Sequence, residues 1–340
     1  MAPTRPSNNN ARVAEGTTTA TLAAERRHGL GPGVRKREVF GWAMYDFANS
    51  GYTTVVLTTI FSAYFVNVVA RDYEHATFVW TFMLALSYTA IMVTAPAIGA
   101  YADVYASKKK LLFFMTVGCV LSTAAMYFVG PGAVALAALL LIVSNFFYGS
   151  GENLAGAFLP ELAQDRALGR VSGWGWSIGY FGGLTALVVC LIIIRRGKAS
   201  GMDEAALVPW TMVATAVVYA LGSIPTFLFL KERAQPRRDV RAASLLGDTF
   251  RGLARAARAL ARFTDLRRFL WCLTIYQSGV AAVISLAGIY AKEVMGFSFE
   301  QLIKLIIFAN VSAAMVRHAT ALIGYRTYPH RSEERRVGKE

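Results

Sequence analysis

Long apolar runs separated by short polar segments make up most of the chain after Phe40. An α-helix needs about 20 mostly apolar residues to cross the hydrocarbon core of a bilayer. Runs of about that length lie at 40–70, 77–101, 111–130, 133–158, 173–194, 206–230, 269–291 and 299–316. The pattern predicts an all-α polytopic membrane protein with eight candidate spans, of which the last is the weakest.

The spacing of the runs divides the chain into five segments. Six closely spaced spans form a first bundle (40–230), and a long hydrophilic loop (231–268) separates it from two more spans (269–316). Residues 1–39 lack periodic apolar positions and are predicted to be a disordered basic tail. Residues 317–340 hold no further span and end in a stretch typical of a translated cloning adapter. This order is typical of a two-half transporter with a truncated second half.

The composition agrees with a membrane protein and argues against a nucleic-acid partner. Hydrophobic residues make up 55% of the chain and charged residues 16%, with a mean hydropathy of +0.42. A net charge of +14 often signals an anionic partner, but here the cations avoid the apolar runs. With a cytoplasmic N-terminus, 23 Lys and Arg residues fall in cytoplasmic segments and five in the opposite loops. This bias predicts that orientation, in a bacterial inner (plasma) membrane or in a eukaryotic endomembrane.

Two local features of the charge pattern add to this topology. Arg195 and Arg196 lie on the predicted outer side, against the bias, and are expected to snorkel at the outer interface. Within 231–268, Leu246, Phe250, Leu253, Ala257 and Leu260 recur at helical spacing with arginines between them. We predict a basic amphipathic helix on the anionic inner leaflet; the alternative is a solvated linker helix between the two halves.

The first and fourth runs each carry a polar stripe at helical spacing. In the first run, Asp46, Asn49 and Thr53 share one face, and Tyr45, Asn49 and Tyr52 form an adjacent stripe. In the fourth run the stripe is Asn145, Tyr148 and Glu152. If the six helices are two inverted three-helix repeats, Asp46 and Glu152 are counterparts near the cytoplasmic end. No Lys or Arg lies in these six runs to neutralise them, so either carboxyl is a candidate proton carrier. The alternative is a gate or a hydrogen bond in helix packing, while Asn49 and Tyr52 are the expected substrate contacts.

The fifth run combines small residues and aromatic residues. Gly175, Gly179 and Gly183 recur every four residues, which favours close packing against another helix over contact with substrate. Trp176 and Tyr180 in the same run are the better candidates for substrate contact.

The loop after the second run resembles the loop signature of the Major Facilitator Superfamily. Gly99, Asp103 and the basic cluster that begins at Lys108 occupy the corresponding positions. Val104 stands where a basic residue is usual, and Ala106 where Gly is usual. The resemblance implies that Asp103 and Lys108 brace the cytoplasmic ends of helices as gate elements.

Three further motifs resemble one branch of that superfamily, the autophagy-related vacuolar amino-acid effluxers and their bacterial relatives. They are Tyr45-Asp46-Phe47-Ala48-Asn49-Ser50, Gly151-Glu152-Asn153 with Phe158-Leu159-Pro160-Glu161-Leu162, and Ser172-Gly173-Trp174-Gly175-Trp176 with Gly179-Tyr180 and Gly182-Gly183. The resemblance implies a secondary transporter of two six-helix halves. In the seventh run, Gln277 stands in Tyr276-Gln277-Ser278-Gly279, where relatives often carry an acid.

These observations predict a secondary transporter that moves a small polar solute. The expected activity is proton-coupled efflux of an amino acid. The expected substrate site lies between the first, fourth, fifth and seventh helices. The alternative is a non-transporting receptor or sensor on the same fold. No Ser-His, paired-Asp, metal-ligand or cofactor pattern argues for an enzyme, and the three cysteines are isolated inside separate runs. Because a two-half pathway needs further helices, we expect the 340-residue chain to be inactive by itself.

Overall fold

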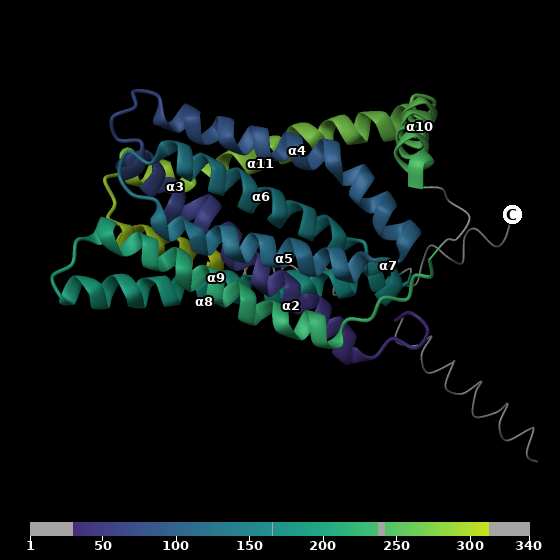
Figure 1. The fold of residues 1–340 in the computed structure, drawn as a ribbon, viewed down its shortest axis with the longest axis horizontal. Coiled ribbons are helices and arrows are strands. Elements are labelled where there is room, and N and C mark those ends of the chain that lie inside the picture. The colour runs from purple at the N-terminus through teal and green to yellow at the C-terminus, as the bar shows by residue number, and fades with distance from the viewer. Residues whose placement is uncertain (1–29, 165, 237–241, 313–340) are drawn as a thin grey trace, which may run out of the picture.

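The first apolar run forms one long span whose hydrogen-bonding pattern changes along its length. A computed structural model describes residues 30–164, 166–236 and 242–312 of the chain. The span contains α2 (Lys36–Tyr52), the π-helix η1 (Thr53–Thr59), α3 (Ile60–Tyr64) and the π-helix η2 (Phe65–Val69). It is the most deeply buried of the seven described helices that are long and apolar enough to cross a membrane. Figure 1 shows these helices running side by side in an elongated bundle.

The remaining elements follow the order of the apolar runs. They are α4 (Ala76–Tyr105), α5 (Lys108–Ala125) with the short 3-10 helix η3 (Met126–Phe128), α6 (Val134–Gly156), α7 (Leu159–Leu162), α8 (Arg166–Ala199), α9 (Glu204–Phe229), α10 (Ala242–Leu260) and α11 (Thr264–Glu293). Residues 299–312 are also helical. We call the end of the bundle where α2, α5, α8 and α11 begin the proximal end, and the opposite end the distal end.

Seven of the eight predicted spans correspond, in the predicted order, to described helices long and apolar enough to cross a membrane, and most of these helices extend past the apolar runs. The first helix begins at Lys36, before the predicted start at Phe40, and α8 begins at Arg166, before the predicted start at 173. Hydropathy marks only the part of a helix that faces lipid or core, whereas backbone hydrogen bonds continue into polar residues. The eighth run is helical as far as residue 312, and its last residues, like most of the predicted 1–39 tail and all of 317–340, lie outside the described residues.

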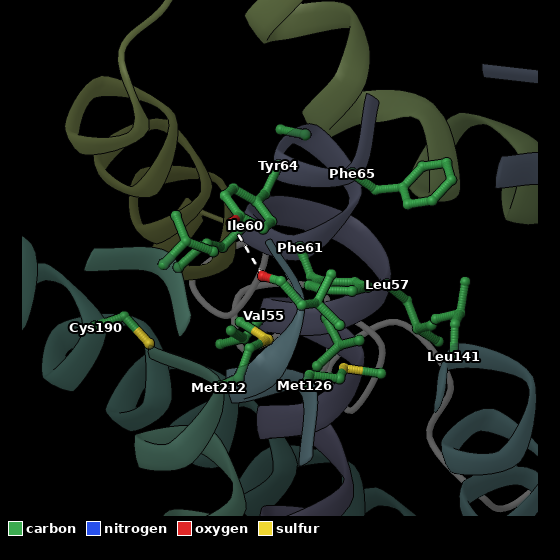
Figure 2. Packing of buried hydrophobic residues seen from close by; sticks show 14 of the residues in the cluster. Val55, Leu57, Ile60, Phe61, Tyr64, Phe65, Met126, Leu141, Cys190 and Met212 are labelled. Carbon is green, nitrogen blue, oxygen red and sulfur yellow. Dashed lines mark hydrogen bonds between the residues drawn. The ribbon is translucent and has the colours of Figure 1, made fainter. Parts of the chain in front are cut away.

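The main core surrounds the distal half of the first span. Side chains from η1, α3 and η2 pack against Met126, Leu141, Cys190 and Met212, which come from η3, α6, α8 and α9 (Figure 2). Tyr64 adds a buried hydrogen bond from its hydroxyl to the carbonyl oxygen of Val129, at 3.1 Å. The first span is therefore the central helix of the bundle, and its side chains reach every neighbouring span of the first six.

The glycine stripe of α8 packs against α2, as the sequence predicted. A Cβ atom placed on Gly179 would lie 2.8 Å from Oγ of Ser50, and one on Gly183 would lie 2.8 Å from Oγ1 of Thr54. Gly182 approaches still more closely, because a Cβ there would collide with the carbonyl oxygen of Phe47. Small residues let two helix backbones approach in this way. The stripe therefore fixes the separation of α2 and α8.

The helix α11 contacts the first six spans only near the distal end. Every residue from Thr264 to Gly279 is exposed, and the buried residues of α11 are Gly288, Ile289 and Ala291. Gly288 sits on η1, where a Cβ would collide with the carbonyl oxygen of Thr58. The start of the second half thus meets the first half distally and is unpacked proximally.

Candidate functional site

The Asp46 and Glu152 side chains lie near one another on α2 and α6. The two helices touch at the residues just before them, since the Tyr45 hydroxyl lies against the Cα of Gly151. The carboxylate of Glu152 is close enough to act electrostatically on Asp46. Asp46 is partly exposed and Glu152 is exposed. The inverted-repeat argument had paired these two acids, and the structure brings them together.

Tyr148 connects the two carboxylate-bearing helices. Its hydroxyl interacts with the carboxyl of Glu152, one helical turn further along α6, and with Thr53 at the start of η1. Its ring stacks on Tyr52, with ring centroids 5.0 Å apart. A hydroxyl next to a carboxyl can donate or accept a hydrogen bond, so Tyr148 is able to follow a change in the protonation of Glu152.

The accessible polar face of α2 differs from the one expected to contact substrate. Asp46, Ser50 and Thr53 recur at spacings of four and three and are partly exposed, whereas Asn49 and Tyr52 are buried. Residues on one helix face lie three or four positions apart. The partly exposed face beside Glu152 is therefore formed by Asp46, Ser50 and Thr53.

Asn49, Tyr52 and Asn145 are engaged in hydrogen bonds between helices. Tyr219 of α9 donates to Oδ1 of Asn49 at 2.6 Å. Oxygen atoms of Tyr52 and Ser144 lie 2.8 Å apart, and Nδ2 of Asn145 donates to Oγ of Ser87 at 3.0 Å. Such bonds join neighbouring helices inside an apolar bundle. In this conformation the three predicted polar side chains link helices.

The other predicted contact residues lie at the edges of this region. Gly175 of α8 packs on Trp42 and on the Asp46 carboxylate, 2.9 Å from the position of a Cβ atom. Its neighbour Trp176 is 55% exposed, and Tyr180 is partly exposed. Gln277 belongs to the exposed proximal stretch of α11. The structure thus places Asp46 against α8 and leaves Gln277 unpacked from the first half.

A network of charged groups, which we call the proximal brace, covers the ends of the helices near Lys108. The Lys108 ammonium lies 3.1 Å from Oδ1 of Asp103 and 3.1 Å from Oε1 of Glu161. Only 11% of the Lys108 side chain is exposed, against 64% for Asp103. The resemblance had implied that Asp103 and Lys108 brace helix ends, and the geometry adds Glu161 of α7 as the more buried partner.

The segment that follows α9 completes the proximal brace. Both carboxylate oxygens of Glu232 accept hydrogen bonds from the N-terminus of α5, at 2.7 Å from the Lys108 amide and 3.1 Å from the Lys109 amide. A carboxylate at this position satisfies unpaired amides and complements the helix dipole. The Arg233 guanidinium lies 2.8 Å from Oε2 of Glu38, whose side chain is 1% exposed. The segment after α9 therefore ties α5, α7 and the start of α2 together.

The two departures of the loop from the superfamily signature have different surroundings. Ala106 ends α4 in the left-handed region, with φ 47° and ψ 54°, and it is the one described non-glycine residue with a positive φ. A side chain at such a position costs roughly 1–2 kcal/mol, which explains why glycine suits it. Val104 is buried at 8% exposure in a place where a basic residue would lose its hydration.

A cavity of about 160 Å³ lies beside the proximal brace. Gly99, Asp103, Lys108, Ser150 and Asn153 are among its lining residues. A Cβ atom on Gly99 would meet nothing within 4 Å, so in this conformation the glycine borders open space and makes no close contact. The signature residues Gly99, Asp103 and Lys108 are therefore found together at one rim.

Several residues of the site were absent from the expectations drawn from the sequence. They are Glu38, Ser144, Glu161, Tyr219, Glu232 and Arg233. Ser144 and Tyr219 interrupt apolar runs and carried a signal of the same kind as Tyr52. Glu232 and Arg233 sit among many other charges of a polar loop, and only their position against α5 and α2 distinguishes them. Among the described residues, no group of three His, Cys, Asp or Glu side chains is placed to hold a metal ion.

Comparisons with known proteins agree with this architecture. Residues 64–334 match the family described as "Vacuole effluxer Atg22 like". The chain is 24% identical over 278 residues to the uncharacterized MFS-type transporter YxiO of Bacillus subtilis (strain 168), covering 80% of this chain and 64% of the relative's length. The fold is also similar to the xylose transporter XylE of E. coli in a partially occluded inward open conformation, with a TM-score of 0.61 and 16% identity over 86% of this chain and 74% of that one.

Proposed function

Since this chain belongs to the Atg22-like family of Major Facilitator transporters, we propose that it carries the first half and the start of the second half of a secondary transporter for a small polar solute. The family and the Bacillus relative are transporters by name, so the protein is a multi-pass membrane protein and not an enzyme. The chain spans 64% of the length of that relative. Transport by alternating access, amino-acid efflux and proton coupling are therefore proposals about the whole protein.

The paired carboxylates carry this proposal. Ionisable groups inside a membrane protein are costly and commonly belong to a substrate or proton pathway. Asp46 and Glu152 interact electrostatically within membrane-spanning helices, and the Tyr148 hydroxyl interacts with the Glu152 carboxyl. Two nearby carboxyls disfavour double ionisation, so one proton shared by the pair and released as solute moves is the mechanism that we propose.

The position of α11 supports alternating access. The proximal part of α11 is exposed and its distal part is packed. This corresponds to a transporter whose two halves are in contact at the distal end and separated at the proximal end. We propose that the proximal end faces the cytoplasm, because most Lys and Arg residues lie on that side. The arrangement then opens Asp46 and Glu152 toward the cytoplasm.

Neutral substitutions of the carboxylates test the proposed coupling. We expect Asp46→Asn and Glu152→Gln each to reduce proton-driven flux of an amino acid by about tenfold or more, because each removes a titratable group from the pathway. Flux is measured in proteoliposomes with a pH gradient, using the longest open reading frame that contains this sequence. Asp203→Asn, which changes an exposed distal acid, is the matched control and should keep wild-type flux. Wild-type rates in both carboxylate variants would remove the pair from the mechanism.

The helix α10 supports a second part of the proposal, contact with the anionic inner leaflet. Phe250 and Leu253 are 45% and 53% exposed on this helix, and Arg251, Arg255 and Arg258 accompany them. We expect a nitroxide label at Leu253 to be accessible to oxygen, and so buried in lipid, in vesicles with anionic headgroups, since each arginine near such a surface contributes about 1 kcal/mol. A label at Arg255 should stay in water. A Leu253 label that stays in water, with the same low accessibility to oxygen in neutral and anionic vesicles, would favour a solvated linker.

A further inference from the structure

A group of charged side chains at the distal ends of helices joins the two halves of the transporter. Nε of Arg195, near the end of α8, lies 2.9 Å from Oε1 of Glu300. Nζ of Lys304 lies 2.7 Å from the same oxygen, one turn further along the helix at 299–312. Arg195 belongs to the first half and Glu300 to the second, so this contact crosses between the halves. The expectation that Arg195 snorkels at the outer interface stays a prediction, and the contact adds an acidic partner for its guanidinium.

We propose that Arg195, Glu300 and Lys304 form a distal latch, which holds the second half against the first in this conformation and must separate before the distal side can open. The proposal rests on the alternating access proposed above. It concerns residues outside the carboxylate pair.

An apolar seal lies beneath the charges. Phe299, Leu302 and Ile303 are each no more than 2% exposed and belong to the same core as Ile194 and Leu207 of the first half. The Lys292 ammonium lies 4.4 Å from the centroid of the Phe299 ring and covers its outer side. The latch therefore lies at the edge of this seal, with the Arg195 and Lys304 side chains 57% and 50% exposed.

Gly288 provides a second, uncharged part of the distal closure. A Cβ there would collide with the carbonyl oxygen of Thr58, lie 2.9 Å from that of Thr59 and lie 3.0 Å from Oγ of Ser62. Two of these three atoms belong to η1, where the backbone makes π-helical hydrogen bonds. π-Helical turns often occur at functional sites. Glycine at this position lets α11 approach the backbone of η1 closely, and a larger residue would hold the two apart.

Distance measurements on the 340-residue chain in lipid nanodiscs test the latch. Spin labels at Ala199→Cys and Met295→Cys report the separation of the halves across the distal end, with the exposed Cys272 changed to Ser. We expect Glu300→Gln to increase the separated population about two- to five-fold, the range for a partly exposed ion pair. Raising the salt concentration should have the same effect on the wild type and little effect on Glu300→Gln.

Matched variants decide between a latch and a loss of folding. Glu293→Gln removes an exposed distal acid that has no ion pair among the described residues, and it should leave the distances unchanged. Arg195→Glu should separate the halves, and adding Glu300→Arg should restore the wild-type distances, because the exchange recreates the pair. Wild-type distance distributions in both Glu300→Gln and Arg195→Glu would overturn the latch. A shift in distances in the 340-residue chain, combined with no solute flux by the product of the longest open reading frame that contains this sequence, would support the latch and count against the proposed function.

Discussion

Replacing Arg233 with Ala is expected to lower the free energy of unfolding by about 3–5 kcal/mol, the cost of leaving a buried charge unpaired. The guanidinium lies 2.8 Å from Oε2 of Glu38, whose side chain is 1% exposed. It also donates a hydrogen bond to the carbonyl oxygen of Gly33 at 3.1 Å. Without Arg233, the Glu38 carboxylate keeps one contact from the Arg35 amide, at 3.2 Å. Unfolding in detergent micelles under increasing SDS measures the loss.

Two further variants show whether the buried charge is the cause. Lys231→Ala removes an exposed cation two residues earlier in the same segment and should change stability by no more than about 0.5 kcal/mol. Glu38→Gln combined with Arg233→Ala should recover much of the lost stability, since the double variant leaves no unpaired carboxylate. Stability within about 0.5 kcal/mol of the wild type for Arg233→Ala alone would contradict this account.

The second large effect is expected at Gly182, where α8 meets α2. A Cβ there would collide with the carbonyl oxygen of Phe47 and lie 2.6 Å from its carbonyl carbon. Both atoms belong to the backbone, so no side chain can move aside and the two helices must separate. We expect Gly182→Ala to cost about 3 kcal/mol, near the upper end for overpacking. Thermal unfolding of the purified chain, followed by circular dichroism, reports the change.

Gly173 provides the control on the same helix. A Cβ at that position would meet nothing within 4 Å, so Gly173→Ala should be neutral or stabilise by up to about 1 kcal/mol through helix propensity. Opposite signs at the two glycines would demonstrate that the effect at Gly182 comes from helix packing. An equal response at both positions would mean that the contact with Phe47 does not control stability.

The carboxylate pair shows how far a periodic pattern can lead. Helical spacing and the idea of inverted repeats were enough to pair Asp46 with Glu152, because both depend on local geometry and on fold symmetry. Spacing also placed Asn49 and Tyr52 on a polar stripe, but it could not show which residues of the stripe face a neighbouring helix. Tyr219 and Ser144 decide this by hydrogen bonding to Asn49 and Tyr52 and burying them.

The proximal brace and the distal latch were beyond the reach of the sequence. Glu232 is 124 positions from the Lys108 amide that it caps, and Arg195 is 105 positions from Glu300. Charged residues in loops carry no periodic signal that indicates their partners, and the chain contains 35 cations and 21 acids to choose from. Only the packing of the helices selects these pairs.

The sequence by itself determined the class of this protein: its spans, their order, the amphipathic helix between the two groups of spans and the family motifs. These depend on hydrophobic runs of a length set by the bilayer and on short motifs, both of which are local properties. Only the tertiary structure decided which polar side chains join helices and which remain accessible, and that α11 meets the first half at one end. Those features depend on contacts between residues distant in the chain, whose energies are set by burial and by the geometry of the partners.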